Sequence, residues 1–401
     1  MNLRLELPRE IRRNFYLDVA AAMSVGFFIA VTLTFVPVVA RRLGADFAQM
    51  SLIAAAPFAG SLFTPLASYY LQGRRKMPFL VWFWNIARGL FILTLFVTSP
   101  LPLTMIVLAF NILTAFAVPG YAEMMRLVYP NECRGRAMSY VRVGMTAVVT
   151  LMTPLAGRLL DLVGYRYLFP VGAAFGIASS TIFGRIRVQE TVARDRQPFG
   201  RFWRILKDDK AFAAYQVAFM VYGFGNLMAL PVFPVFQVDV LGLTYSQIGV
   251  LGFIMAVFWL LFYVYWGREV DHRGGLWTVK LNFLITSLVF SAYVFAWDVR
   301  LVAVAFVFIG ITNAGIDLGW MNALMQFAPA EKVSEYASLH TTLLGVRGLL
   351  APFVGIALLQ VPWIGFKGIF GVCFLMMVIS WLLLAVAPRD ARTWPSRRGV
   401  P

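Results

Sequence analysis

The stretch GYAEMMRLVYPNE at positions 120–132 decides the fold of this chain, because a related stretch, GWMNALMQFAPAE, occurs at 319–331. The glycine, an aromatic residue, the proline and the glutamate return at a constant offset of 199, and Ser139 returns as Ser338. Further along, a Pro-x-x-Gly sequence at 154–157 returns at 352–355. A two-fold repeat that spans about half of a 401-residue apolar chain predicts a duplicated membrane bundle, the usual plan of secondary transporters.

Composition places the chain in a membrane. Hydrophobic residues make up 60% of it and charged residues 13%, and the mean hydropathy is +0.75. Apolar runs of about 20 residues predict helices, since the strands of a membrane barrel would alternate over about 10. We therefore predict an all-α integral membrane protein of twelve transmembrane helices in two six-helix, pseudo-symmetric halves. The predicted spans are 15–38, 47–71, 78–98, 102–126, 137–160, 166–184, 211–235, 245–267, 276–297, 300–326, 336–360 and 364–387.

These spans divide the chain into three parts. Residues 1–184 form the N-terminal bundle, 185–210 a polar cytoplasmic linker with an amphipathic segment, and 211–401 the C-terminal bundle. With both termini inside, 26 of the 35 lysines and arginines fall on the cytoplasmic side and five on the other. This bias predicts a multi-pass protein of the cytoplasmic (inner) membrane with both termini cytoplasmic, and it explains the net charge of +16 without a nucleic-acid partner.

Several kinds of chemistry find no motif in the sequence. No cleavable signal peptide is evident. The two cysteines cannot support a disulfide framework, because Cys133 falls in a predicted inside loop and Cys373 in the last predicted span. No cluster with metal-ligand spacing and no nucleotide-binding glycine pattern occurs. We expect neither a cofactor, nor a metal, nor an enzymatic activity, and any transport would be driven by gradients.

Two loops resemble those of the major facilitator superfamily. Residues 267–275 read Gly-Arg-Glu-Val-Asp-His-Arg-Gly-Gly, which is similar to the family's G-x-x-x-D-R-x-G-R/G loop, and 130–137 is similar to its P-x-x-x-R-G pattern around Arg134. The first-half copy of the loop is degraded, with Leu66 in place of the first glycine and Tyr70 in place of the aspartate. The resemblance covers nearly the whole chain.

The resemblance implies a gate on the cytoplasmic side. Gly267 would allow close helix approach, Asp271 would latch the inner face, and Gly274 would permit the sharp turn. Arg134 belongs to the same set of loops. The alternative is an ordinary short charged turn. We also assign Glu123 and Arg142, at matching depth in the inner third of two helices, to the gate; a purely structural pair is the alternative.

A second charged pair lies near the predicted membrane midplane. Asp317 and Arg347 are each about 15 Å from the inner ends of their helices. Asn313 and Trp320 lie within a turn of Asp317, and Asn226 is a single amide in a glycine-rich span. We assign these five residues to substrate binding and coupling; a static ion pair that locks two helices is the alternative.

For three further polar residues in the predicted spans we favour structural roles. We expect Asp18 to face the inner surface, with a pair to an arginine as the alternative. Arg88 would extend its long side chain toward the interface or pair with an acid, and His340 would pack between helices, with a proton relay as the alternative.

Together these features favour a secondary active transporter that works by alternating access and is proton-coupled, exporting a small amphipathic or drug-like solute. An uncoupled facilitator, a lipid translocase and a membrane sensor on a transporter fold remain alternatives. The expected partners are the small-molecule substrate, a proton and the lipid bilayer, and the expected state is a monomer.

Overall fold

The computed structural model describes residues 9–71, 74–188, 204–329 and 332–386, which are helical apart from short turns. The chain divides into two compact units. The first comprises residues 1–196 with 244–250, and the second comprises 197–243 with 251–401. Most of the predicted linker and the repeated residues 330 and 331 lie outside the described residues.

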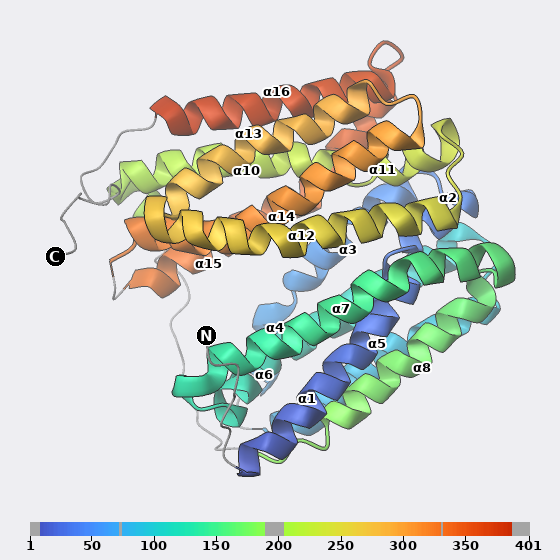
Figure 1. The fold of residues 1–401 in the computed structure, drawn as a ribbon, viewed down its shortest axis with the longest axis vertical. Coiled ribbons are helices and arrows are strands. Elements are labelled where there is room, and N and C mark those ends of the chain that lie inside the picture. Colours follow the sequence, from blue (N-terminus) through green and yellow to red (C-terminus); the bar gives the residue numbers. More distant parts are fainter. Residues whose placement is uncertain (1–8, 72–73, 189–203, 330–331, 387–401) are drawn as a thin grey trace. The chain divides into compact units, whose positions relative to one another are not determined.

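The first unit consists of long helices joined by short turns (Figure 1). Its elements are α1 (Arg9–Phe28), η1 (Ile29–Leu33), α2 (Val36–Arg42), α3 (Phe47–Ser61), α4 (Thr64–Leu71), α5 (Lys76–Gly89), η2 (Leu90–Leu95), α6 (Pro100–Val128), α7 (Asn131–Val163) and α8 (Tyr165–Phe183).

The second unit has its long helices in the same order. The first residues of α12, up to Val250, belong to the first unit. Its elements are α9 (Ile205–Asp208), α10 (Lys210–Ala229), α11 (Val232–Val235), η4 (Phe236–Val240), α12 (Tyr245–Arg273), α13 (Gly275–Val294), α14 (Val299–Phe327), α15 (Val333–Leu359) and α16 (Gly365–Val386).

The predicted helical class is confirmed, and helices occupy all twelve predicted spans in the described part of the chain. Ten helical segments there are long and apolar enough to cross a membrane. The other two spans are 47–71, which a turn at Leu62 and Phe63 divides into α3 and α4, and the shorter α8. Helices are the expected solution in lipid because each one satisfies its own backbone hydrogen bonds.

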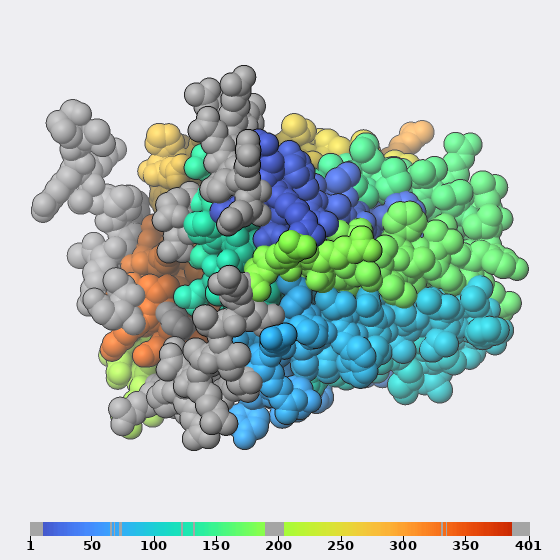
Figure 2. Space-filling view, turned by 90° about the horizontal axis from the view of Figure 1, so that it is seen from below, coloured from blue at the N-terminus to red at the C-terminus, as the bar shows by residue number. Residues whose placement is uncertain are grey.

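The internal repeat is visible in how the helices pack. In the first unit α1 packs on α7 and α8, while α5 packs on α6 and α8. Figure 2 shows α1 (blue) beside α8 (light green) along one face. In the second unit α10 packs on α15 and α16, while α13 packs on α14 and α16. The two units therefore use the same pairs of helices.

The turn after the first helix also repeats in atomic detail. Gly44 and Gly242, 198 residues apart, both have a positive φ, of 89° and 59°, which favours glycine. Each turn is followed by a capping box. The Asp46 carboxylate accepts from the amide of Gln49 at 2.7 Å, and the Thr244 hydroxyl accepts from the amide of Gln247 at 3.2 Å.

Aromatic side chains fill the cores of both units. In the first unit Phe91 lies 5.5 Å from Phe28 and 5.4 Å from Phe110, measured between ring centroids. In the second unit Phe370 lies 4.9 Å from Tyr293 and 5.4 Å from Phe236.

Candidate functional site

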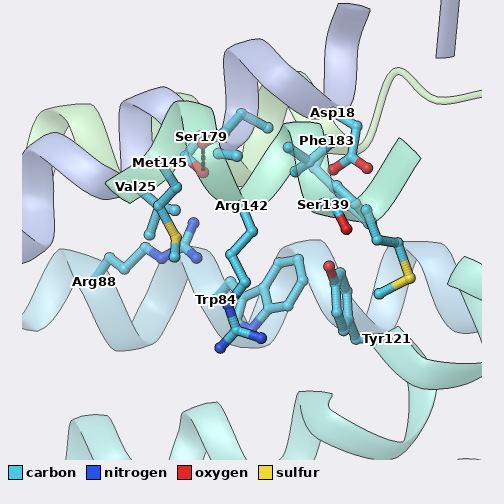
Figure 3. Close-up of a pocket in the computed structure, with 14 residues that line it drawn as sticks. Asp18, Val25, Trp84, Arg88, Tyr121, Ser139, Arg142, Met145, Ser179 and Phe183 are labelled. Atoms are coloured by element: carbon cyan, nitrogen blue, oxygen red, sulfur yellow. Dashed lines mark hydrogen bonds between the residues drawn. The ribbon is translucent and has the colours of Figure 1, made fainter. Parts of the chain in front are cut away.

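The first unit encloses a cavity of about 460 Å³ between α1, α5, α6, α7 and α8 (Figure 3). This volume lies in the range of sites for small molecules. Three charged side chains line it, each from a different helix: Asp18 of α1, Arg88 of α5 and Arg142 of α7. Its lining therefore combines charge with the apolar surface of a membrane bundle.

Arg88 is buried in the wall of the cavity. Its side chain is 8% exposed, and Nη1 donates to the carbonyl oxygen of Gly176 at 2.8 Å. Its guanidinium carbon lies 5.2 Å from the ring centroid of Trp84. The absence of a Cβ at Gly176 lets the Arg88 methylenes lie directly on α8, since a Cβ there would be 3.0–3.2 Å from them. No acidic side chain among the described residues contacts this arginine.

Asp18 is also buried, with 3% of the residue exposed. One of its carboxylate oxygens accepts a hydrogen bond of 2.8 Å from the hydroxyl of Tyr129, which follows the end of α6. Burial raises the pKa of Tyr129, so its hydroxyl stays protonated and donates. Figure 3 shows Asp18 and Arg88 at opposite ends of the lining.

Arg142 differs from these two because it is exposed and makes no hydrogen bond or ion pair with any described residue. Figure 3 shows it extending from α7 toward Trp84. Its guanidinium is therefore the cationic group of the cavity that is available to a ligand. Arginine suits this task because it stays charged and binds carboxylates and phosphates through two hydrogen bonds.

An aromatic wall from three helices faces these charges. Trp84 of α5 lies 5.8 Å from Tyr121 of α6 and 5.4 Å from Phe183 of α8, measured between ring centroids. Tyr121 and Phe183 lie 5.9 Å apart. The cavity thus has an apolar, flat-sided part beside its charged part, which is the lining an amphipathic molecule requires.

The static ion pair between Asp317 and Arg347, which was the alternative interpretation of these residues, is absent from the described structure. Their assignment to substrate binding and coupling stays a prediction. Asp317 is exposed and accepts a 2.6 Å hydrogen bond from the hydroxyl of Tyr263 on α12. Arg347 is 5% exposed, and its Nη1 donates to the carbonyl of Phe219 on α10, whose ring it also covers at 4.9 Å. Asp317 and Arg347 match in predicted depth, but their side chains contact different helices, α12 for Asp317 and α10 for Arg347.

The other residues predicted for the substrate site contact different neighbours. Asn313 has a weak contact with the sulfur of Met255, at 3.9 Å from Nδ2, and Asn226 is exposed. Trp320 stacks on His340 at 5.1 Å, and the Nδ1 of that histidine lies 3.0 Å from the Gln216 side-chain oxygen. The expectation that His340 packs between helices agrees with these contacts.

The gate residues are also arranged differently from the prediction. Glu123 pairs with Lys76 at 2.5 Å instead of Arg142, so the predicted Glu123–Arg142 pair was wrong. Arg134 donates from Nη2 to the carbonyls of Arg126 and Tyr129 at 3.0 Å and thereby ties α7 to the end of α6.

In the 267–275 loop, nothing lies within 4 Å of a Cβ placed on Gly267, so the close approach expected there was wrong. The close contact is at Gly275, which packs directly on Asn322 and Ala323 of α14. Gly274 has a φ of 84°, as a sharp turn requires. Asp271 is exposed and makes no contact with another described polar group, and its gate role stays a prediction.

Sequence reasoning thus named Arg142, but for the gate, and it gave Asp18 and Arg88 only structural roles. It assigned neither Trp84 nor Tyr121 to a site. Depth along a helix gives no information about which way a side chain faces. The repeat supplied a usable signal, however, since positions 88 and 142 carry arginine while the residues 199 positions later are Ser287 and Thr341.

Comparison with known proteins gives the family. The Major Facilitator Superfamily model matches residues 19–352 and again 217–400. No curated protein sequence matches significantly. Solved structures share the fold across nearly the whole chain. A mutant of nucleoside transporter NupG matches with a TM-score of 0.72 at 12% identity, over 94% of this chain and 100% of that one.

Two other solved transporters match similarly. A bacterial homologue of the human lysosomal transporter Spinster, described as inward-facing and unoccupied, has a TM-score of 0.65 at 13% identity, over 95% of this chain and 96% of its own. A D-xylose–proton symporter has a TM-score of 0.68 at 14% identity, over 94% and 98%. At these identities the likeness establishes the fold alone.

Proposed function

The chain belongs to the major facilitator superfamily, and from this premise we propose that it is a proton-coupled secondary transporter that exports a small amphipathic solute by alternating access. It would work as a monomer in the cytoplasmic membrane, with both termini in the cytoplasm. The distribution of lysine and arginine supports that orientation.

The observation that carries the proposal is the cavity of the first unit. It is large enough for a small molecule, and four of the five helices around it are long and apolar enough to span a membrane. Its lining joins an aromatic wall to the Arg142 guanidinium. A sugar site would need a denser set of free polar groups. Two of the lining hydroxyls instead bond to backbone carbonyls, Ser139 to Gly135 and Ser179 to Ala21.

Asp18 is the best candidate for the proton site. It is a buried carboxyl at the edge of the cavity, and its described partner is a neutral hydroxyl. A carboxyl in that setting exchanges a proton at lower cost than one held by a cation. Asp317, which the sequence favours for coupling, and Glu123 are both more exposed, and Glu123 is paired with Lys76.

The proposal is tested in everted membrane vesicles from cells that produce the chain. After acidification of the vesicle interior, a panel of aromatic carboxylates, aromatic amines and neutral arenes is added, and the pH gradient is followed by a fluorescent amine. Proton-coupled export predicts that at least one compound releases protons from these vesicles and not from vesicles with Asp18→Asn.

The alternatives give different results in the same vesicles. Uptake of a compound without proton movement would indicate an uncoupled facilitator. Accelerated flipping of a labelled lipid, with no response to any compound, would indicate a lipid translocase. Absence of both responses would contradict transport and favour a sensor.

A further inference from the structure

We propose that the cavity of the first unit is selective for organic anions, with the negative group of the substrate bound by Arg142 and its apolar part held against Trp84 and Tyr121. The inference rests on the proposed function, because it names the substrate class of the same site.

The lining of the cavity carries more positive than negative charge, with two arginines and one carboxylate. Arg88 and Arg142 face one carboxylate, Asp18, and Asp18 is bonded to the Tyr129 hydroxyl and forms no ion pair with either arginine. The described partners of Arg88 are the neutral carbonyl of Gly176 and the Trp84 ring. Ionisable residues within membrane spans mark substrate pathways, and a lining with more cations than anions favours a negatively charged ligand. A bound anion would neutralise the remaining charge.

The internal repeat shows which of these charged residues the shared fold requires. Leu80 packs on Gly120 in the first unit, and Val279 packs on Gly319 in the second, so a single offset of 199 aligns α5 with α13 and α6 with α14. The same offset aligns the starts of α7 and α15 through Ser139 and Ser338.

At this offset the two arginines are replaced by hydroxyl residues. Arg88 corresponds to Ser287, whose hydroxyl donates to the carbonyl of Leu284 at 2.6 Å. Arg142 corresponds to Thr341, whose hydroxyl donates to the carbonyl of Ala337 at 2.7 Å. Each hydroxyl is satisfied within its own helix. The bundle therefore forms without a cation at either position, and the charges of the first unit are additions to the shared fold.

The third charge of the cavity is likewise particular to the first unit. The prolines Pro37 and Pro234, together with the close-packed glycines Gly26 and Gly223, align α1 with α10 at an offset of 197. Asp18 then corresponds to Tyr215, which is a neutral, buried side chain. None of the three charges is thus repeated.

The aromatic wall of the cavity has a counterpart in the second unit. Trp84 and Tyr121 correspond to Phe283 and Trp320, so both units have aromatic rings at these positions. In the second unit the rings are covered: Tyr222 stacks on Phe283 at 4.1 Å, and His340 stacks on Trp320 at 5.1 Å.

His340 occupies the position of Val141, a smaller residue that lines the cavity of the first unit. A smaller side chain there leaves space in front of Tyr121, where a flat apolar group of a ligand would take the place of the histidine ring. The same pair of positions thus holds a ring–ring contact within the protein in one unit and an open site in the other.

The experiment measures binding without any gradient. Detergent-purified full-length chain is tested by equilibrium dialysis with three labelled probes of one shape: naphthylacetate, its neutral amide and the cationic naphthylethylamine. We expect saturable binding of naphthylacetate, with at least tenfold weaker binding of the amide and the amine. In Arg142→Gln the dissociation constant for naphthylacetate should rise about tenfold or more, since a hydrogen bond to a charged group is lost.

Two further variants keep the result interpretable. Arg142→Lys retains the charge and should recover part of the affinity. Arg158→Gln removes an exposed arginine from the same helix outside the cavity and should bind like the unmodified chain. Equal binding of all three probes, no saturable binding of naphthylacetate, or an equal loss in Arg142→Gln and Arg158→Gln would overturn the anion site.

The outcome is separable from that of the proposed function. Arg142-dependent anion binding without proton movement in vesicles would leave the site standing and refute coupled transport. Proton release by amines or neutral arenes, with no effect of Arg142→Gln on any binding, would support transport and refute anion selectivity.

Discussion

Gly223→Ala should displace Arg347 and destabilise the second unit. The guanidinium of Arg347 occupies the space beside the Gly223 backbone that a Cβ would need. The same side chain is 5% exposed and donates to the carbonyl of Phe219. A methyl group at position 223 therefore forces a buried cation out of its described hydrogen bond.

The magnitude follows from three contributions. Overpacking of a filled interior costs about 1–3 kcal/mol, and losing a hydrogen bond from a charged donor costs about 1.5–3 kcal/mol. Replacing glycine by alanine within a helix offsets about 0.5–1 kcal/mol of this. The net loss is about 1.5–5.5 kcal/mol, and for a unit of about 200 residues this lowers the Tm by roughly 3–22 °C.

The assay is thermal unfolding of the purified chain in detergent, followed by intrinsic fluorescence. Gly267→Ala is the matched control, because nothing lies within 4 Å of a Cβ there, and its Tm should stay unchanged or rise. Gly223→Ala combined with Arg347→Met should regain much of the loss, since a flexible apolar chain replaces the displaced cation. A Tm for Gly223→Ala within about 2 °C of the unmodified chain would refute the placement of Arg347 on Gly223.

Three further predictions test the remaining arrangement. Asp317→Asn should shift the Tm by less than about 2 °C, because Asp317 is exposed and bonded to Tyr263; a fall as large as that of Gly223→Ala would restore the predicted pair with Arg347. Glu123→Gln should cost about 1–3 kcal/mol of stability, less than a fully buried pair because the Glu123 side chain is 44% exposed, whereas Arg142→Gln should cost almost nothing. The reverse order in denaturant or thermal unfolding would favour the predicted Glu123–Arg142 pair. Single cysteines placed in 190–198 and in 162–165, in a chain lacking Cys133 and Cys373, should label from opposite sides of the membrane, and labelling of both from outside would contradict the orientation.

The fold could be predicted from sequence because it depends on properties that can be measured along the chain. The length of an apolar run determines whether it spans a bilayer, and the repeat at 199 determines how many times the plan occurs. The turn at Leu62 and Phe63 was missed, since the run 47–71 is continuous in hydropathy. The charged pairs failed for a related reason. Two residues at equal depth in the membrane can pair only if their helices are also rotated so that the side chains face each other, and depth gives no information about that rotation.

Rotation is set by what each side chain packs against, and the repeat carries some of that information. Two positions related by 199 have the same depth and the same facing, so a difference between them cannot be explained by the shared fold. Arg88 against Ser287 and Arg142 against Thr341 are such differences, whereas the aromatic pair Tyr121 and Trp320 is common to both units. In a duplicated bundle, the residues that hold the architecture are those that the halves share, and the residues that act on a substrate are to be sought among those that differ. Arg142 and Asp317 both meet that criterion, since their counterparts are Thr341 and Val118. Arg142 ranks above Asp317 as a substrate contact because it lines the cavity without a described partner, while Asp317 is bonded to Tyr263.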